Sequence, residues 1–479
     1  MRRGIVVSLP LKGRAGKLAY AVGAIGDTGF YQVINGWLLF FLTQRVLLDP
    51  WLAGLAFALS FGVLNALSAP LIGSLSDRVR TRFGRRRPFI MIGAPLTILF
   101  FVLLWSPPTG GKPLTDPLGF GVFLFVLIIL GAWAWTYSMA AVTWFALFPE
   151  MWESVKDRSE VVMYRQIFGV VGGALAVAVF PILVVVMAGR FGEFNGWIWA
   201  GFILGAVFAG AYVSSLLGIN ERKEFSADTS LPMGKAIIAT FSNKTLRTYV
   251  MIDLMTWCMT GWLSATMPYF VTKSLGLMEG DVALLMAPSM IGIFAFFLLW
   301  RAVYLRYGPK LTLGAAIITF TLSFFPCLYV QSVWQGALWA FFVGAAMGGV
   351  LLAREVMMGD VVDEDEIKTG ARREGSCFGA FIAIEKISFV IIGFSTAVLL
   401  SVFIGYVPGK PEPAFMDMGI RIGMFLFTAL YMVVALIFLS RYPLGKEKVA
   451  VLCKQVEELH KAKAKKLEAT ARRDDSVNT

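Results

Sequence analysis

The sequence predicts an all-α membrane protein with twelve transmembrane helices in two six-helix bundles. Three observations predict this fold: a series of long apolar runs, an alternation of cations between the loops that join them, and one long polar segment that divides the runs six and six. Of the 479 residues, 57% are hydrophobic and 15% are charged. Soluble domains are usually about 45–50% apolar and about 25% charged.

The apolar runs are long enough to cross a membrane. A transmembrane helix needs about 20 mostly apolar residues for a hydrocarbon core of about 30 Å. We count twelve such runs and number them spans 1 to 12: 18–46, 52–75, 89–105, 118–148, 162–188, 196–217, 249–271, 282–303, 311–330, 337–358, 377–404 and 418–439. The number and length of these runs exclude a large soluble protein with buried helices.

Lysine and arginine residues gather in alternate loops. They are frequent at the N-terminus, after spans 2, 4, 6, 8 and 10, and in the C-terminal segment, while the intervening loops contain almost none. This positive-inside pattern predicts that both termini lie in the cytoplasm. The basic N-terminus shows no small-residue cleavage site, so we expect a retained tail and not a signal peptide. Because the cations follow the topology, the net charge of +12 does not indicate nucleic-acid binding.

These patterns divide the chain into five parts. We expect an N-terminal cytoplasmic tail, a six-helix bundle, a cytoplasmic central loop, a second six-helix bundle and a charged cytoplasmic tail, at residues 1–17, 18–217, 218–247, 248–441 and 442–479. The stretch MGKAIIATF in the central loop fits either a helix on the membrane surface or an ordinary linker. The C-terminal tail has apolar positions on one side of a helix, which fits a cytoplasmic cap or an assembly helix.

Several classes of site are missing from the sequence. The four cysteines (Cys258, Cys327, Cys377 and Cys453) are scattered and indicate neither a disulfide framework nor a metal site. The one histidine, His460, lies in the C-terminal tail, so proton chemistry within the membrane must use carboxylates. We find no nucleotide-binding loop and no nucleophile constellation. The sequence therefore predicts no cofactor and neither a pump nor an intramembrane enzyme.

Three motifs carry a resemblance to a known family. GSLSDRVRTRFGRRRP, after span 2, is similar to the signature loop of major facilitator transporters; the matching residues are Gly73, Asp77, Arg78, Gly84, Arg85 and Arg86. GDVVDEDEIKTGARREGSCFGAFIAIEKISF resembles the branch of the melibiose carrier, the glycoside–pentoside–hexuronide:cation symporters. Its matching residues are Asp360, Asp363, Lys368, Thr369, Gly370, Arg373, Glu374, Gly375 and Lys386. YAVGAIGDTGF resembles the first helix of this branch, with Gly23, Gly26 and Asp27 in place.

The resemblance implies a secondary active transporter that moves a sugar or glycoside with a cation by alternating access. In sodium-coupled members, two aspartates on helix two hold the cation and an aspartate on helix four binds the sugar. The corresponding positions in this sequence are Asn65, Ala69 and Ala141 or a close neighbour. Because these acids are replaced, we expect the coupling ion to be a proton and not sodium.

Asp27, in span 1, is a candidate for proton coupling. A charge at the centre of a membrane helix costs about 2.5–3.5 kcal/mol on insertion scales, so charges that occur there are candidates for function. Tyr31 and Asn35 follow at i+4 and i+8 and form a polar stripe with Asp27. An apolar setting favours the neutral form of a carboxyl, which would let Asp27 carry a proton. The alternative is a simple hydrogen bond to a neighbouring helix.

Lys386 lies inside span 11, next to Glu385. Neighbouring helix positions point about 100° apart, so each of the two side chains needs its own partner. We predict that Lys386 faces the cavity and is neutralised by Asp27 or Glu385; the alternative is a lysine that snorkels outward. Glu385 fits either a proton carrier or a structural counter-ion.

The remaining candidates form two groups. We expect a substrate cavity between the bundles, lined by Tyr31, Asn35, Asn65, Trp144, Arg165, Asp253 and Trp257. We also expect a cytoplasmic gate of charge-assisted bonds between helix ends. Its members are Asp77, Arg78, Arg85, Arg86, Glu150, Arg354, Asp360, Asp363 and Arg373. Asp253, Arg354 and Glu355 could instead form a salt bridge between helices that holds one conformation.

Two other functions stay open. The missing acid on helix four would suit a more apolar cargo, such as a lysolipid, on the same fold. The replaced acids are also the one argument for a transport-inactive membrane receptor. For the transporter, we expect a small solute, a proton and membrane lipids as partners, no nucleic acid, a monomeric state, and a location in the cell membrane, in bacteria the inner membrane.

Overall fold

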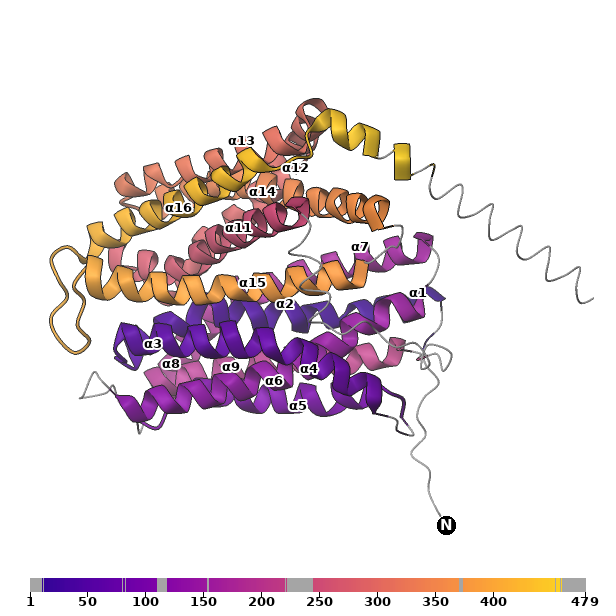
Figure 1. Cartoon of the computed structure of the whole chain (residues 1–479). Coiled ribbons are helices and arrows are strands. Elements are labelled where there is room, and N and C mark those ends of the chain that lie inside the picture. Colours follow the sequence, from indigo (N-terminus) through magenta and orange to yellow (C-terminus); the bar gives the residue numbers. More distant parts are fainter. Residues whose placement is uncertain are drawn as a thin grey trace, which may run out of the picture.

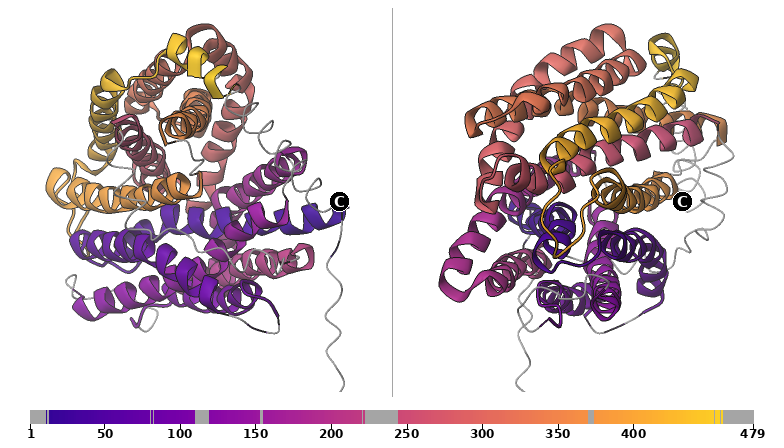
Figure 2. Two further views of the ribbon diagram at one scale, coloured as in Figure 1. Left: turned by 45° about the vertical axis from the view of Figure 1, so that its right-hand side comes forward. Right: turned by 90° about the vertical axis from the view of Figure 1, so that its left-hand side faces the viewer.

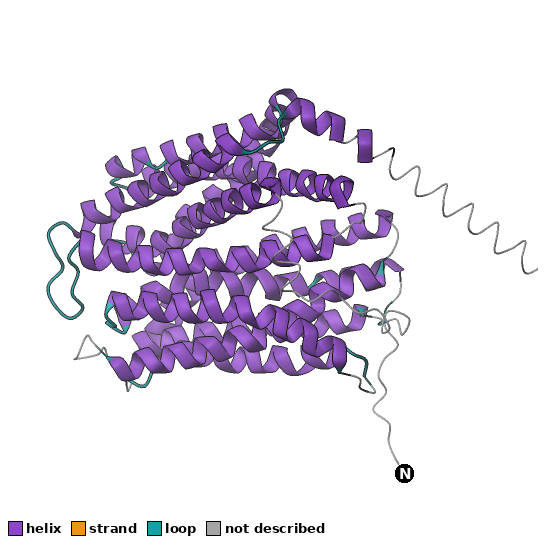
Figure 3. Ribbon diagram, viewed as in Figure 1, coloured by secondary structure: helices purple, strands orange, loops and turns teal. Residues whose placement is uncertain are grey.

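The structure is a computed structural model that describes residues 11–458, except residues 12, 80, 82, 110–118, 153–154, 220, 222–243, 370–373, 453 and 457. Helices dominate the described residues (Figure 3), and the only other regular feature among them is a β-bridge between Thr81 and Gly84. A helical segment of the described chain coincides with each of the twelve predicted spans. The prediction of an all-α membrane protein is confirmed.

The first six spans contain both α-helices and π-helical turns. Span 1 consists of α1 (Gly13–Ala21), α2 (Gly23–Val33), η1 (Ile34–Leu38) and η2 (Phe41–Arg45), and span 2 consists of α3 (Pro50–Phe57), η3 (Ala58–Leu64) and α4 (Asn65–Arg78). Spans 3 and 4 are single helices, α5 (Arg87–Leu104) and α6 (Phe120–Met151). Span 5 consists of α7 (Val155–Ala174), η4 (Leu175–Val179) and α8 (Phe180–Phe191), and span 6 consists of α9 (Glu193–Ser215) and the 3₁₀ turn η5 (Leu216–Gly218).

The last six spans have a similar make-up. Span 7 consists of α11 (Lys244–Tyr269) and η7 (Phe270–Ser274); span 8 of η8 (Glu279–Asp281) and α12 (Val282–Tyr307); span 9 of α13 (Pro309–Leu322) and η9 (Phe325–Tyr329); span 10 of α14 (Val333–Thr369); span 11 of α15 (Glu374–Ala397) and η10 (Val398–Phe403); and span 12 of α16 (Met416–Arg441).

The spans pack into two bundles, one of spans 1–6 and one of spans 7–12. Figure 1 shows the first bundle below and the second above, with α15 where they meet, and both views of Figure 2 show the same division. We call the end of the bundles at which α1 lies the tail end, on the right of Figure 1. The opposite end, which carries the loop before α16, is the far end.

Ten helical segments of the described chain are apolar and long enough to cross a membrane. Spans 1 and 7 are not among these ten. Span 1 is interrupted at Val22 and carries Asp27, while α11 carries several threonines and Asp253. The two segments contact each other where the bundles meet. Their polar residues therefore belong to the inside of the protein, where the membrane tolerates them best.

The most extensive contacts between the bundles in the described part of the chain join spans 1 and 7, spans 2 and 11, and spans 5 and 8. Spans 2 and 11 cross closely because glycines face each other. A Cβ atom on Gly54 would lie 2.6 Å from the carbonyl oxygen of Gly393, and one on Gly62 would meet Val390. Small residues allow such close approach of membrane helices. The close crossing brings the middle of span 2 against the middle of span 11.

The far end is held closed by polar contacts between the bundles. The hydroxyl oxygens of Thr43 and Tyr269 lie 2.7 Å apart, and the Tyr406 hydroxyl donates to the carbonyl oxygen of Thr43 at 3.1 Å. Arg45 forms an ion pair with Glu279 of the second bundle. The far end of span 1 is thus tied to span 7, to span 8 and to the loop before span 12.

Candidate functional site

Two tyrosines hold Asp27 inside the first bundle. Its Oδ1 accepts hydrogen bonds from the hydroxyl of Tyr137 in span 4, at 2.7 Å, and from that of Tyr212 in span 6, at 2.9 Å. Gly26 lets span 1 lie directly against span 6, because a Cβ atom there would meet the Phe208 carbonyl. Asp27 is nevertheless only partly buried. A carboxyl that has two hydroxyl donors and stays partly exposed is suited to proton exchange.

Tyr31 and Asn35, the other members of the predicted polar stripe, lie where the bundles meet. The ring of Tyr31 contacts Phe61 of span 2 and Phe389 of span 11, with 5.1 Å between ring centres in each case. Asn35, in η1, is 5% exposed, and its Oδ1 has no hydrogen-bond partner. It lies beside Gly261 of span 7. Both side chains therefore touch the second bundle, whereas Asp27 is bound within the first.

Lys386 reaches across the bundle interface to Asn65. Its Nζ donates to Asn65 Oδ1 at 2.8 Å and to the Asn65 carbonyl oxygen at 3.2 Å. Lys386 is 5% exposed and Asn65 is fully buried. Asn65 begins α4 directly after the π-helical turn η3, and such turns are frequent at functional sites. Asn65 occupies the position at which sodium-coupled members of the family have an acid. In this structure it is the hydrogen-bond partner of the buried Lys386.

The neutralisation of Lys386 by Asp27 or Glu385 stays a prediction: both carboxylates interact electrostatically with the ammonium, but neither is in contact with it. No carboxylate oxygen of the described side chains lies within 4.0 Å of its Nζ. Asp27 is bound to its two tyrosines, and Glu385 interacts with Tyr31 and Arg354. Glu385 and Lys386 point in different directions because they are adjacent on one helix. The lysine ammonium thus has an uncharged partner.

Arg354 of α14 forms a buried ion pair with Asp253 of α11. Its Nε lies 3.4 Å from Asp253 Oδ1, and the two side chains are 7% and 8% exposed. The guanidinium also lies 4.1 Å above the ring of Trp257, and the Tyr249 hydroxyl donates to the Arg354 carbonyl at 2.9 Å. Glu355, whose side chain is 65% exposed, lies 3.6 Å from Arg354 Nη2. The inter-helix salt bridge considered from the sequence is present.

Trp144 does not line a cavity in this structure. It is fully buried, its Nε1 donates to the Tyr20 carbonyl at 3.1 Å, and the Tyr20 hydroxyl donates to the Trp144 carbonyl at 2.8 Å. The two rings stack at 5.0 Å. Arg165, which is partly buried, lies 4.8 Å above Trp144 and 4.4 Å above Phe145. Trp144 joins span 4 to span 1 because its N–H needs a buried acceptor and finds one there.

The predicted gate residues at the tail end contact their own bundles where the structure describes their contacts. Arg86 donates to the Ala146 carbonyl, and Asp360 accepts from the Tyr304 hydroxyl at 3.3 Å. Asp363 lies partly buried in α14. The side chains of Asp77, Arg78 and Glu150, and the whole of Arg373, lie outside the described residues. A gate formed by these residues stays a prediction.

Glu221, which the sequence did not single out, anchors the arginine-rich loop. Its carboxylate accepts hydrogen bonds from the backbone N–H groups of Arg85, Arg86 and Arg87, at 2.6, 2.9 and 2.7 Å. These groups form the N-terminus of α5, and unsatisfied N–H groups at a helix N-terminus bind anions well. The contact ties the segment after span 6 to the start of span 3.

We expect Glu221→Ala to lower the free energy of unfolding of the purified protein by about 1–3 kcal/mol, because it leaves three backbone donors without their acceptor. Glu221→Gln keeps one acceptor oxygen and should lower it less. Thermal unfolding in detergent measures both effects. Glu447→Ala, at an exposed glutamate of the tail end, is the control. Equal unfolding midpoints for Glu221→Ala and this control would contradict the anchoring role.

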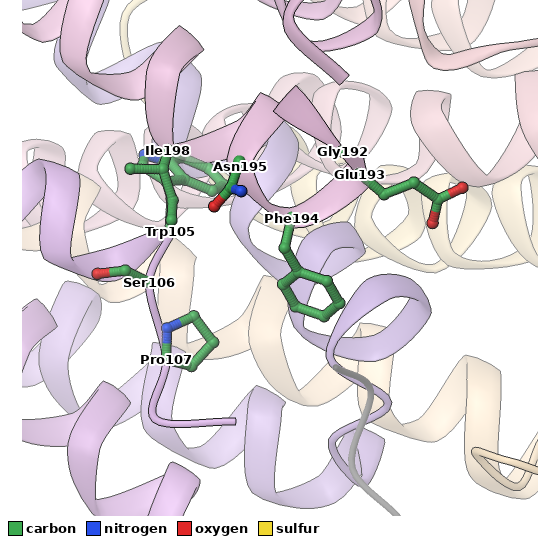
Figure 4. A pocket seen from close by; sticks show the side chains of 8 residues that line it. All are labelled: Trp105, Ser106, Pro107, Gly192, Glu193, Phe194, Asn195 and Ile198. Atoms are coloured by element: carbon green, nitrogen blue, oxygen red, sulfur yellow. The ribbon is translucent and has the colours of Figure 1, made fainter. Parts of the chain in front are cut away.

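One pocket lies at the far end of the first bundle, away from the charged residues between the bundles. It has a volume of about 410 Å³ and lies between the end of α5 and the start of α9 (Figure 4). Trp105, Ser106 and Pro107 line one part, and Glu193 and Phe194 line another. None of the predicted cavity residues lines it, so it does not correspond to the predicted substrate cavity.

Two six-helix bundles with a charged side chain, Lys386, buried where they meet are typical of a membrane transporter whose bundles move against each other. The chain matches the family described as MFS/sugar transport protein over residues 19–446. It therefore belongs to this family of the major facilitator superfamily. The resemblance to glycoside–pentoside–hexuronide:cation symporters is confirmed.

Curated proteins and solved structures resemble the chain over almost its whole length. An uncharacterised symporter of Synechocystis sp. is 25% identical, over 90% of this chain and 94% of that protein. A putative sulfoquinovose importer of Escherichia coli is 24% identical, over 96% of both chains. The crystal structure of a bacterial homologue of the human lysosomal transporter Spinster superposes with a TM-score of 0.65, at 15% identity, over 89% of this chain and 95% of that one. This last similarity shows the shared fold.

Proposed function

We propose that the protein moves a sugar or glycoside across the cell membrane together with a proton, by alternating access. The observation that carries the proposal is the set of charged groups inside the spans: Lys386, which is buried where the bundles meet, and Asp27 and Glu385, which are partly buried. Such groups are costly in a membrane and persist where transport needs them. The family description supports a sugar as the solute, and the symporter names of relatives support coupling to a cation.

A proton suits this site better than a sodium ion. The position on span 2 that holds an acid in sodium-coupled members is Asn65, and its Oδ1 already accepts the ammonium of Lys386. A sodium ion there would lie against the positive charge of Lys386 and be repelled by it. Asp27 needs only its own carboxyl to carry a proton, and its tyrosine partners can donate to the charged form.

The far-end contacts fit one side of an alternating-access cycle. The positive-inside pattern supports a cytoplasmic tail end and an extracellular far end. The contacts of Thr43 with Tyr269 and Tyr406, and that of Arg45 with Glu279, would then close the extracellular side. They would break when the bundles rock, and the predicted gate at the tail end would close in their place.

Substrate counterflow in proteoliposomes tests the proposal. We expect labelled monosaccharides or disaccharides to exchange with unlabelled sugar inside the vesicles without any ion gradient. Counterflow needs no coupling ion, so the assay detects sugar exchange whether the coupled ion is a proton or sodium. Silence across the sugar panel, with folded protein confirmed by its unfolding transition, would contradict sugar transport. Exchange of a lysolipid would then favour the more apolar cargo, and binding without exchange would favour a receptor.

A further inference from the structure

Arg45 lies between two acids at the far end, one from each bundle. Its Nη2 forms the ion pair with Glu279 of span 8, and its Nη1 lies 3.5 Å from Oε2 of Glu193, the first residue of span 6. The side chain of Arg45 is 32% exposed, that of Glu279 is 10% exposed and that of Glu193 is 76% exposed. The guanidinium therefore has a largely buried partner across the interface and an exposed partner in its own bundle.

Arg45 and Glu193 are held side by side within the first bundle. Phe41, one turn before Arg45, packs with its ring centre 6.2 Å from that of Phe194 and 5.0 Å from that of Trp197. These contacts join the end of span 1 to the start of span 6. Because both ends belong to one bundle, Glu193 stays within reach of Arg45 when the two bundles move against each other.

Glu279 moves with the second bundle. It begins the 3₁₀ turn η8, and α12 of span 8 follows directly. The next residue, Gly280, rests on the end of span 5 in the first bundle, since a Cβ atom there would lie 3.4 Å from the side chain of Val185. Separation of the bundles at the far end breaks this apolar contact and carries Glu279 away from Arg45.

The two acids differ in how much they stabilise the closed and the open far end. Glu279 binds Arg45 only while the far end is closed. Glu193 shares the guanidinium with Glu279 in the closed state, and two like charges that lie close together repel each other. The repulsion ends when Glu279 moves away, and both arms of the guanidinium can then bind Glu193. The Glu193 side chain lines the far-end pocket (Figure 4), so its carboxylate has room to turn.

We propose that Arg45 exchanges partners as the far end opens: it leaves Glu279 and is held by Glu193. Glu279 thus stabilises the closed state, and Glu193 stabilises the open state. A partly buried arginine that lost every partner on opening would make the open state costly. An interaction shifts an equilibrium only by the difference of its strength in the two states, so replacement of the two acids has opposite effects. The inference rests on the alternating access proposed above, and it is independent of the solute.

Distances between two spin labels test the exchange. Phe120→Cys in span 4 and Tyr329→Cys in span 9 place one label on each bundle, at exposed positions of the far end. Cys377 and Cys453 are replaced by serine, and the two buried cysteines stay in place. Pulsed double electron–electron resonance of the full-length protein in lipid nanodiscs then gives the populations of the closed and the open far end as a shorter and a longer distance.

We expect Glu279→Gln to raise the ratio of open to closed protein at least about threefold and Glu193→Gln to lower it at least about twofold, since partly exposed ion pairs have modest effects. Both variants are also combined with Tyr269→Phe. This change removes the hydroxyl contact with Thr43 and loosens the closed far end without touching Arg45. The open population is then large enough for a fall to be measured.

Glu412→Gln is the matched control, because its carboxylate pairs with Lys273 at the same end but within the second bundle. It should leave the ratio unchanged. A ratio that rises in Glu193→Gln as it does in Glu279→Gln would mean that both acids hold the closed state. This result, or an unchanged ratio in Glu193→Gln, would overturn the exchange and leave alternating access intact. One single distance in every variant, including those with Tyr269→Phe, would overturn both.

Discussion

Asp27→Asn is expected to abolish proton-driven accumulation of the solute. The amide has the size of the carboxyl, and its oxygen can still accept the hydroxyls of Tyr137 and Tyr212, so the bundle keeps its packing. It cannot take up and release a proton. Steady-state accumulation in proteoliposomes with an imposed pH gradient should therefore fall at least about tenfold, which corresponds to about 1.4 kcal/mol of lost coupling.

The pH dependence of uptake separates loss of coupling from damage to the fold. We expect accumulation by the wild-type protein to decline as the proton gradient is removed, and accumulation by Asp27→Asn to stay at the equilibrium level at every pH. Tyr137→Phe removes one hydroxyl donor but leaves the carboxyl, so it should retain coupling. The proposal is wrong if Asp27→Asn and Glu385→Gln both leave accumulation and its pH dependence unchanged.

The fold could be predicted from the sequence because membrane insertion is a local property. Each span needs its own run of apolar residues, and each loop its own charges, so a reader of the sequence can find both without knowing any contact. The two spans that are least apolar, 1 and 7, carry Asp27 and Asp253. Their polarity shows that they lie inside the protein, and the same residues were singled out as candidates.

The partners of the candidate residues could not be predicted, since they depend on contacts between distant spans. Lys386 and Asn65 are separated by 321 positions, and their contact follows from the close crossing of spans 2 and 11 at Gly54 and Gly393. Nothing in the sequence near Lys386 indicates that crossing. The partners of Asp27 could not be predicted for the same reason, because one of them, Tyr212, belongs to the distant span 6.

The place of Trp144 away from any cavity in this structure has a chemical reason that the sequence does contain. A buried indole N–H needs an acceptor, and burial of the ring is common when one is available. Trp144 finds the carbonyl of Tyr20 in span 1, and no sequence pattern indicates that pairing. An aromatic residue in a polar span is therefore as well suited to joining helices as to stacking on a sugar, and the sequence alone does not separate the two roles.

Removal of one partner of the Arg354–Asp253 pair is expected to destabilise the second bundle strongly. Both side chains are less than a tenth exposed, and loss of one partner leaves the other as an uncompensated buried charge. This typically costs about 3–5 kcal/mol. Arg354→Gln also removes the cation that lies 4.1 Å above Trp257, which adds about 2 kcal/mol in a desolvated setting. Thermal unfolding of the purified full-length variants in detergent measures these losses.

A double-mutant cycle distinguishes the pair from two independent residues. If the ion pair is the cause, Asp253→Asn combined with Arg354→Gln should be less destabilising than the sum of the single variants, by about 1–3 kcal/mol. Glu193→Gln is the control: its carboxylate lies 3.5 Å from Arg45 Nη1, but the Glu193 and Arg45 side chains are 76% and 32% exposed, and exposed pairs contribute about 0–1 kcal/mol. Additive losses at positions 253 and 354 would mean that the two charges act separately. Arg354 would then depend on Trp257 and Glu355 for its place in the second bundle.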